Sequence, residues 1–205
     1  MRRKILLLGD SIRMGYQPFV QDILKNEAEV WAPDENCAYA LYTVTRLSIW
    51  LKEFGVPDLV HWNNGLHDSG CNLRRGPVQF SIGDYLRNLE EIYKQLQATG
   101  AKIIWATTTP VSKIQTQIPF WSFSNEDITK YNLAASNFAM TNNLVINDLH
   151  ALLEDKEEYF SEDHIHLNEC GRKVLAQQVV SVLRDNLAYV NNNKELTIKK
   201  DTIHN

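Results

Sequence analysis

Short runs of aliphatic and aromatic residues alternate along the chain with longer segments in which apolar residues recur every three or four positions. Five of the short runs are mostly apolar and do not alternate with polar residues, as is typical of strands that are buried on both faces of a sheet. They lie at residues 4–8, 29–32, 59–62, 102–106 and 144–146. The pattern therefore predicts five buried strands.

The segments between these runs predict helices. In residues 81–99 the apolar positions fall at steps of three and four, Ser81 and Asp84 resemble a capping box, and Gly100 follows the last turn. Similar periodicity predicts further helices over residues 41–54, 124–138 and 175–183, and a short one over residues 18–25.

Strands that alternate with helices of this length imply βαβ crossovers, which are right-handed and build a parallel sheet covered on both faces. We therefore predict an α/β fold, a three-layer α/β/α sandwich with a five-stranded parallel sheet. Residues 1–190 are expected to form a single domain. Residues 191–205 are polar and lack an apolar face, so they are expected to form a C-terminal tail that is frayed or serves as a docking arm.

The composition is that of a globular protein with one core, because 44% of the 205 residues are hydrophobic and 22% are charged. The formal net charge of -4, with no cluster of Lys and Arg, argues against a nucleic-acid partner. No stretch approaches the roughly 20 apolar residues of a membrane span, and the apolar run after Lys4 is too short for a signal-peptide core. The sequence is therefore interpreted as cytoplasmic, and it does not indicate the oligomeric state.

The cysteine and histidine spacings indicate neither a disulfide framework nor a metal site. Three cysteines at wide spacing are interpreted as reduced structural thiols, and the six histidines match no metal-ligand motif. Neither a dinucleotide-binding GxGxxG motif nor a phosphate-binding P-loop motif is present, which argues against a nucleotide-binding domain. We therefore expect no metal ion and no cofactor.

Polar residues that follow the predicted strands are the first candidates for a site, because ligands of open parallel sheets bind beyond the carboxyl ends of the strands. The first strand is followed by Gly9-Asp10-Ser11, and the third by NNGLHD at residues 63–68. Ser11 could cap the first helix or serve as a nucleophile. Asp10 is expected to tie the turn through backbone N–H groups.

A second motif lies near the other end of the domain. Asp163 and His166 are three residues apart, just before the last predicted helix, which Asn168 is placed to cap. In such a turn the carboxylate can bind the Nδ1 hydrogen of the imidazole and leave Nε2 free to accept a proton from a hydroxyl. Ser11 is the natural donor of that proton, because a Ser-His-Asp triad is defined by geometry and not by chain order.

These two motifs resemble the first and last signature blocks of the SGNH hydrolases, also called the GDSL esterase and lipase family. The first block is LLLGDSI, and the last is Asp163-His164-Ile165-His166, followed by Leu167 and Asn168. The resemblance spans nearly the whole domain and implies a flavodoxin-like SGNH hydrolase fold. It also implies a nucleophilic Ser11, a general base His166 oriented by Asp163, and hydrolysis through a covalent acyl-enzyme.

The resemblance further implies an oxyanion hole with three donors, the last of them an Asn in a Gly-x-Asn-Asp third block. Here the corresponding residues 65–68 read Gly-Leu-His-Asp, so His67 stands at the Asn position and Asn64 is the alternative donor. A neutral imidazole can donate a hydrogen bond as an amide does. Asp68 is expected to orient the His67 ring or to cap the following turn.

The other two donors in this family are the backbone N–H of the nucleophile and that of a Gly in a second block. The corresponding stretch, PDENCAYALYT at residues 33–43, contains no Gly. The backbone N–H of Cys37 or Ala38 is therefore expected to donate instead, with the side chain of Asn36 as a further donor.

The leading hypothesis is a serine esterase with a small carboxylic ester as its small-molecule partner. The chain has no large lid domain to shelter a long acyl chain, and Asn36, Asn64 and Arg13 are expected at the mouth of the site, so an acetylated carbohydrate is a reasonable substrate. A short-chain lipase or a thioesterase is an alternative. A second hypothesis is a non-catalytic ligand- or carbohydrate-binding module on the same fold, because the expected Gly and Asn are absent.

Overall fold

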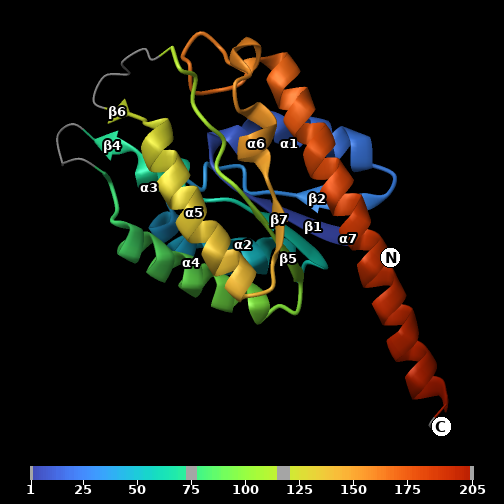
Figure 1. Cartoon of the computed structure of the whole chain (residues 1–205). Coiled ribbons are helices and arrows are strands. Elements are labelled where there is room, and N and C mark those ends of the chain that lie inside the picture. The colour runs from blue at the N-terminus through green and yellow to red at the C-terminus, as the bar shows by residue number, and fades with distance from the viewer. Residues whose placement is uncertain (1, 73–77, 115–120, 204–205) are drawn as a thin grey trace.

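The structure, a computed structural model, describes residues 2–72, 78–114 and 121–203. Its centre is a five-stranded parallel sheet in the order β2-β1-β3-β5-β7 (Figure 1). The strands are β1 (Arg3–Leu8), β2 (Ala28–Trp31), β3 (Leu59–Trp62), β5 (Lys102–Ala106) and β7 (Val145–Asn147). The predicted sheet is confirmed, and each strand begins and ends within one residue of its expected position.

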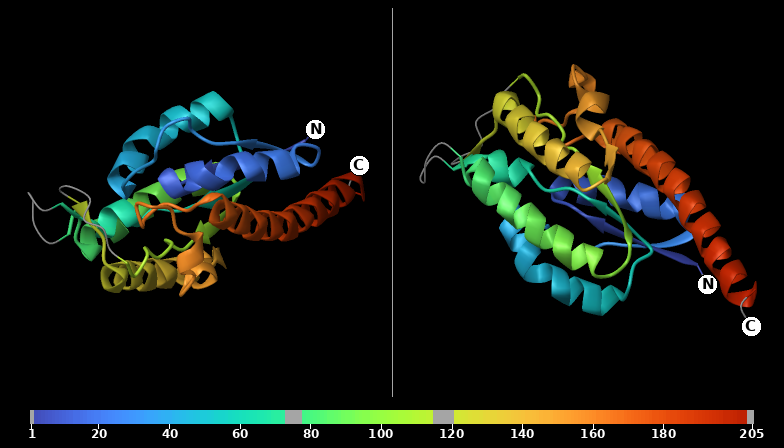
Figure 2. Two further views of the ribbon diagram at one scale, coloured as in Figure 1. Left: turned by 90° about the horizontal axis from the view of Figure 1, so that it is seen from above. Right: turned by 60° about the horizontal axis from the view of Figure 1, so that its bottom comes forward.

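Helices cover both faces of this sheet and produce the predicted three layers (Figure 2). The longer helices are α1 (Ser11–Leu24), α2 (Ala40–Phe54), α4 (Ile82–Gln97), α5 (Asn125–Thr141) and α7 (Glu169–Ile203). The shorter elements are α3 (Leu66–Ser69), α6 (Leu149–Leu153), the 3-10 turn η1 (Glu157–Tyr159) and an antiparallel pair of β4 (Cys71–Asn72) and β6 (Trp121–Ser122).

The side chains of β1 show how the strand joins the two helix layers. Ile5 and Leu7 point into the core shared with α1 and α7, whereas Leu6 and Leu8 point into the core shared with α2 and α4. All four side chains are fully buried, and burying a side chain of this size stabilises a fold by roughly 1.5–3 kcal/mol. The continuous apolar run therefore holds both layers, as the sequence pattern predicts.

Helix α1 begins at Ser11, earlier than the apolar periodicity predicts. The reason is a cap: Oδ1 of Asp10 accepts a hydrogen bond of 2.9 Å from the backbone N–H of Ile12. Pro18 lies inside the helix, where it removes one backbone donor. Because Val20 is buried beyond the proline, packing continues to support the helix there.

The last helix is longer than predicted. Asn168 caps α7 by accepting the N–H of Gly171 at 3.0 Å, and the helix extends to Ile203 (Figure 1). Residues 191–203, expected as a tail, continue this helix, and the domain boundary at residue 190 stays a prediction. Over the described ranges of the chain, no helix is both long enough and apolar enough to span a bilayer.

The strand order creates a crevice at the carboxyl ends of β1 and β3. From β1 the chain crosses to β2 on one side, and β3 then lies on the other side of β1. Ligands of open α/β sheets bind at such a switch point. The segment Gly9-Asp10-Ser11 follows β1 and residues 63–68 follow β3, so the fold brings the two polar segments to the same crevice.

His61 interrupts the apolar run of β3 and is fully buried. Its Nε2 accepts a hydrogen bond of 3.0 Å from the Asn147 amide nitrogen, and its Nδ1 lies 3.5 Å from the Tyr16 hydroxyl. Oδ1 of Asn147 accepts in turn from Gln178 of α7 at 3.0 Å. Burial lowers the pKa of the imidazole from 6.5 to about 4, so the ring is neutral at pH 7.

The buried imidazole predicts a pH-dependent contribution to stability. The unfolded chain takes up a proton at His61 near pH 6.5 but the folded chain only near pH 4, so the contribution is complete above pH 6.5 and is lost as the pH falls through 4. Its full size is about 3 kcal/mol. The wild type should be more stable than His61→Gln at pH 7, and this difference in the free energy of unfolding should shrink by about 3 kcal/mol at low pH.

Urea denaturation at both pH values measures the difference. Leu59→Val, a change without a titrating group, is the control. A difference between wild type and His61→Gln that did not depend on pH would contradict the assignment.

Candidate active site

The turn after β1 is held by a close approach at Gly9. A Cβ at this position would lie only 2.7 Å from Cβ of Arg13, so a larger residue does not fit. The Gly9 carbonyl accepts hydrogen bonds from the N–H of Cys37 at 3.2 Å and from Nε of Arg13 at 3.3 Å. The terminal nitrogens of Arg13 donate to the carbonyls of Pro33 and Glu35. The segment after β2 is thereby fastened to the start of α1.

Asp10 and not Ser11 caps the first helix. The Asp10 carboxylate is buried and ties the turn through the N–H of Ile12, as expected from the sequence. Ser11 is the first residue of α1, so its hydroxyl is not needed to cap the helix. Among the residues that the structure describes, no acceptor binds the backbone N–H of Ser11, which is usual in the first turn of a helix.

Ser11, His166 and Asp163 lie in one line of hydrogen bonds, although they come from opposite ends of the chain. Oγ of Ser11 lies 2.8 Å from Nε2 of His166, and Nδ1 of His166 lies 2.5 Å from Oδ2 of Asp163. An imidazole held in this way can accept a proton from the hydroxyl, while the carboxylate stabilises the imidazolium that forms. The three residues that the sequence motifs single out are therefore brought together.

Several donors stabilise the charged form of Asp163. Partial burial raises the pKa of this carboxyl, but hydrogen bonds from the His166 ring, the N–H groups of Ile165 and His166, and the Ser161 hydroxyl hold the pKa well below its usual range. Asp163 therefore stays ionised at neutral pH, where it orients the imidazole and does not take up its proton.

The turn that carries Asp163 and His166 is closed on itself and tied to the loop after β5. Ser161 donates its N–H to the His166 carbonyl at 2.8 Å, and Ser112 donates its N–H to the His164 carbonyl at 2.9 Å. The Ser161 hydroxyl lies 2.8 Å from Oδ1 of Asp163. Sequence reasoning did not identify Ser161, because a serine two residues from an aspartate is common in any turn.

The segment from Asn36 to Ala38 does not supply the backbone donors that the sequence predicts for an oxyanion. The N–H of Cys37 is bound to the Gly9 carbonyl, and the N–H of Ala38 is bound to Oδ1 of Asn36 at 2.7 Å. Neither backbone group is left for an oxyanion. Ala38 has a φ of 47°, the left-handed conformation that favours glycine, in the segment where the resemblance implies a Gly. The amide nitrogen of Asn36 has no acceptor among the described residues, so it stays a candidate donor.

Two residues expected at the mouth of the site are buried. Nδ2 of Asn64 donates to the Ala38 carbonyl at 3.2 Å and to Oγ1 of Thr43 at 3.1 Å, and its Oδ1 accepts from Nε1 of Trp62 at 2.8 Å. Both amide hydrogens of Asn64 are therefore used, and none remains for an oxyanion. Arg13 is only 2% exposed because its guanidinium binds backbone carbonyls, so it does not face a substrate either.

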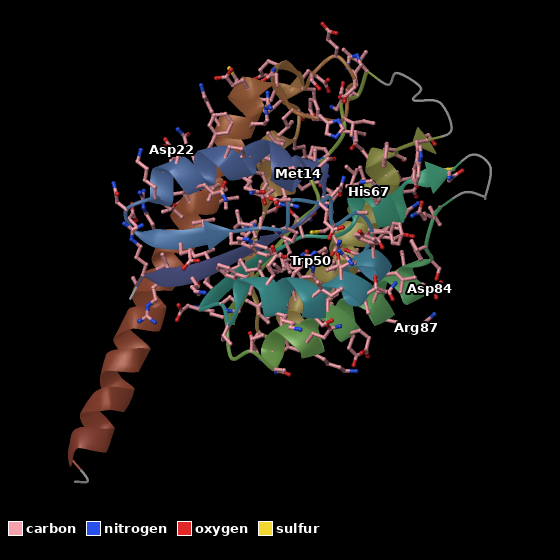
Figure 3. The ribbon with its side chains drawn as sticks, turned by 180° about the vertical axis from the view of Figure 1, so that it is seen from behind. Met14, Asp22, Trp50, His67, Asp84 and Arg87 are labelled. Carbon is pink, nitrogen blue, oxygen red and sulfur yellow. The ribbon has the colours of Figure 1, made fainter. Side chains whose placement is uncertain are left out.

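His67 and Asp68 are adjacent in α3, but their side chains contact different parts of the protein. The His67 ring is partly exposed and meets Trp121 edge to face, with the ring centroids 6.2 Å apart; Figure 3 labels His67 on this short helix. The Asp68 carboxylate neither orients that ring nor caps the next turn. It is fully buried and accepts the N–H of Ala40 with both oxygens, at 3.0 and 3.1 Å, which joins α3 to the first residue of α2.

A cavity of about 200 Å³ opens beside the Ser11 hydroxyl. It is lined by Ser11, Ile12, Gly15, His166, Leu167 and Arg172. The Ser11 and His166 side chains are therefore accessible to a small molecule. In the described parts of the chain, no group of three or more His, Cys, Asp or Glu side chains is arranged to hold a metal ion.

Comparison with protein families identifies the chain. The model of the GDSL-like Lipase/Acylhydrolase family matches residues 7–174, a range that contains both Ser11 and the turn from Asp163 to His166. The protein belongs to this family, as its two motifs predict, and it is a carboxylic ester hydrolase of the GDSL type. No curated protein matches its sequence significantly.

Solved structures share the fold at low sequence identity. The acetyl xylan esterase AlAXEase has a TM-score of 0.68 at 20% identity, and the match covers 87% of this chain and 98% of that one. The psychrotrophic esterase EstA from Pseudoalteromonas sp. has a TM-score of 0.69 at 15% identity, with 90% and 98% covered. A GDSL-like lipase from Bacteroides thetaiotaomicron VPI-5482 has a TM-score of 0.69 at 13% identity, with 90% and 89% covered. At these identities the likeness shows the fold, and it confirms the predicted SGNH hydrolase fold.

The environment of Asp68 predicts a second effect of pH on stability. Burial raises the pKa of this carboxyl from 3.8 to about 7, against the opposing effect of the bond from Ala40. The folded chain therefore binds the proton more tightly, and the contribution to stability is complete below pH 3.8 and is lost as the pH rises through 7.

We expect Asp68→Asn, which keeps an acceptor for Ala40, to gain up to about 4 kcal/mol relative to the wild type between pH 4 and pH 8. Urea denaturation at the two pH values measures this change. Asp22→Asn, at the far end of α1 (Figure 3), is an exposed control. If Asp68→Asn changed stability equally at both pH values, the carboxyl of Asp68 would not carry the proton.

Proposed function

We propose that this protein is a serine esterase that hydrolyses a small carboxylic ester through a Ser-His-Asp triad and a covalent acyl-enzyme. The observation that carries the proposal is the hydrogen-bonded line from Oγ of Ser11 through His166 to Asp163, with an open cavity at its Ser11 end. The alternative of a non-catalytic binding module does not account for three aligned side chains of the types that nucleophilic catalysis needs.

Acylation begins when Oγ of Ser11 attacks the carbonyl carbon of the ester and Nε2 of His166 takes the hydroxyl proton. Asp163 holds the ring through Nδ1 and stabilises its positive charge. The tetrahedral intermediate then breaks its bond to the alcohol oxygen, which leaves with the proton from Nε2. Deacylation repeats these steps with water as the nucleophile and returns Ser11 to its free form.

The oxyanion is proposed to bind the backbone N–H of Ser11, the ring of His67 and the amide nitrogen of Asn36. Each of these groups lies without a protein acceptor in the described part of the chain, which a preformed oxyanion hole requires. Asn64 is not included, because both of its amide hydrogens bind protein oxygens.

A small acyl group attached to a carbohydrate is the substrate that we propose. The cavity of about 200 Å³ is smaller than a typical site for a drug-sized ligand, which has roughly 300–1,000 Å³, so it favours a small ester as a whole. The similar structure of AlAXEase is that of an acetyl xylan esterase, which is consistent with an acetyl group. Short-chain lipids and thioesters are the competing substrates for a comparative assay.

Replacement of the nucleophile tests the proposal directly. We expect Ser11→Ala to abolish labelling by a fluorophosphonate probe and to lower the turnover of p-nitrophenyl acetate by a factor on the order of 10⁴ or more, because no other residue supplies the attacking oxygen. Ser48→Ala, an exposed serine on α2, is the matched control and should be labelled and active like the wild type. A wild type that neither labels nor turns over any ester from acetate to laurate would favour the binding module instead.

Two substitutions of His67 test the oxyanion hole. His67→Phe should lower kcat roughly 100- to 1,000-fold with little change in KM, because the lost hydrogen bond is made mainly to the transition state. His67→Asn restores an amide donor and should recover much of kcat. Steady-state kinetics with p-nitrophenyl acetate measures both variants. If kcat of His67→Phe equalled that of the wild type, the side-chain donor would be Asn36 alone.

A further inference from the structure

One of the described residues that line the cavity beside Ser11, Arg172, carries a permanent positive charge. Of the described lining residues, Ile12 and Leu167 supply apolar walls, Ser11 and His166 supply the reacting groups, and Arg172 supplies a guanidinium. An arginine in the substrate cavity of an esterase affects which substrates bind, because it stays charged at every pH at which the enzyme is active.

Arg172 differs from the other arginines that the structure describes. Its Nε donates to the Asn168 carbonyl of its own helix at 3.4 Å, and its terminal nitrogens bind no oxygen of the described chain. The others each donate from a terminal nitrogen to a protein oxygen: Arg2, Arg3, Arg13, Arg46, Arg87 and Arg184. The nearby acid Glu169 is paired with Lys173. The fork of donors on Arg172 is therefore available to a ligand.

Packing against α1 fixes the position of the aliphatic stem of Arg172. A Cβ at Gly15 would lie 3.0 Å from Cδ and 3.4 Å from Cγ of Arg172, so the aliphatic part of Arg172 lies directly over the helix backbone at Gly15. Gly15 follows Ser11 by four residues, which is about one helical turn or ~5.4 Å along the axis. The stem of Arg172 is thus held about one turn of α1 from the nucleophile, beside the cavity that both residues line.

We propose that Arg172 determines substrate specificity by binding a carboxylate on the alcohol portion of the ester. The inference rests on the proposed function, because it takes Ser11 as the nucleophile. His166 lines the cavity and would protonate the alcohol oxygen, whereas the proposed oxyanion donors Asn36 and His67 do not line it. The alcohol portion of the substrate is therefore the part that extends toward Arg172.

A carboxylate is the anion that fits this arrangement. The guanidinium fork can bind its two oxygens with two parallel hydrogen bonds, which gives both affinity and orientation. The walls at Ile12 and Leu167 can pack against the carbon atoms between the ester oxygen and the charge, as in an acylated sugar acid. Hydrolysis then splits the ester with one water molecule into the free acid and a hydroxy carboxylate.

The test compares two acetyl esters, 4-acetoxybenzoate, which carries a carboxylate, and methyl 4-acetoxybenzoate, in which the same group is an uncharged methyl ester. The ratio of their kcat/KM values is measured for the wild type and for Arg172→Gln, so that intrinsic reactivity cancels. We expect Arg172→Gln to lower the preference for the charged ester by roughly 10-fold or more, the usual effect of losing a hydrogen bond to a charged group.

Lys173→Gln is the matched control, because it removes a cation from the adjacent position of α7 that does not line the cavity. It should leave the ratio unchanged, and Arg172→Lys should retain part of the preference. An unchanged ratio in Arg172→Gln would overturn the proposal. Loss of preference for a charged acyl group instead, measured with p-nitrophenyl hemisuccinate against p-nitrophenyl butyrate, would overturn the placement of the anion on the alcohol portion.

A binding measurement separates this proposal from the catalytic one. The Ser11→Ala protein should bind the product alcohol 4-hydroxybenzoate more tightly than its methyl ester in isothermal titration calorimetry, and the additional change Arg172→Gln should remove the difference. Equal affinity for the two alcohols would overturn the role of Arg172 whatever the turnover. An active Ser11→Ala enzyme would overturn the proposed mechanism and leave the binding result to stand by itself.

Discussion

The close approach of the chain to itself at Gly9 is the constraint on which the rest of the site depends. Because Gly9 has no Cβ, the stem of Arg13 can cross it, and the Gly9 carbonyl can accept both Cys37 and Arg13. The segment that contains Asn36 is thereby fixed beside the end of β1. Asp10 can then cap α1, and Ser11 becomes the first residue of the helix. Gly9 and Asp10 therefore have separate physical tasks, close approach and capping, and both leave the Ser11 hydroxyl free for the catalytic role that we propose.

The architecture could be predicted from the sequence because its causes are local or periodic. Strands buried on both faces must be continuously apolar, and a sheet built by βαβ crossovers must be parallel. The pairing of Ser11 with the turn at Asp163 and His166 could be predicted because both motifs lie at element boundaries that the pattern places. The predicted start of α1 at residue 18 is wrong, because the cap at Asp10 determines where the helix begins and the apolar periodicity does not.

The rest of the site could not be predicted, because it depends on contacts between segments that are distant in the chain. Nothing in the local pattern shows that Asn64 would bind Ala38 and Thr43, or that Arg13 would bind backbone carbonyls. Both side chains are polar, and polarity alone predicts that a residue near a motif is exposed. The local pattern assigns Asp68 to the neighbouring His67 ring or to the following turn, whereas its carboxylate binds the backbone N–H of Ala40, 28 positions away in sequence.

The two buried titratable groups, His61 and Asp68, affect the proton balance of folding in opposite ways. Near pH 5.5 the unfolded chain carries both as ions, whereas the folded chain holds both in their neutral forms. Folding therefore releases one proton at His61 and takes up another at Asp68. The net exchange with the solvent at these two sites is close to zero, and their part of the folding enthalpy at this pH should depend little on the ionisation enthalpy of the buffer. The protein can thus bury two ionisable side chains without these two sites making its stability steeply sensitive to mild acid.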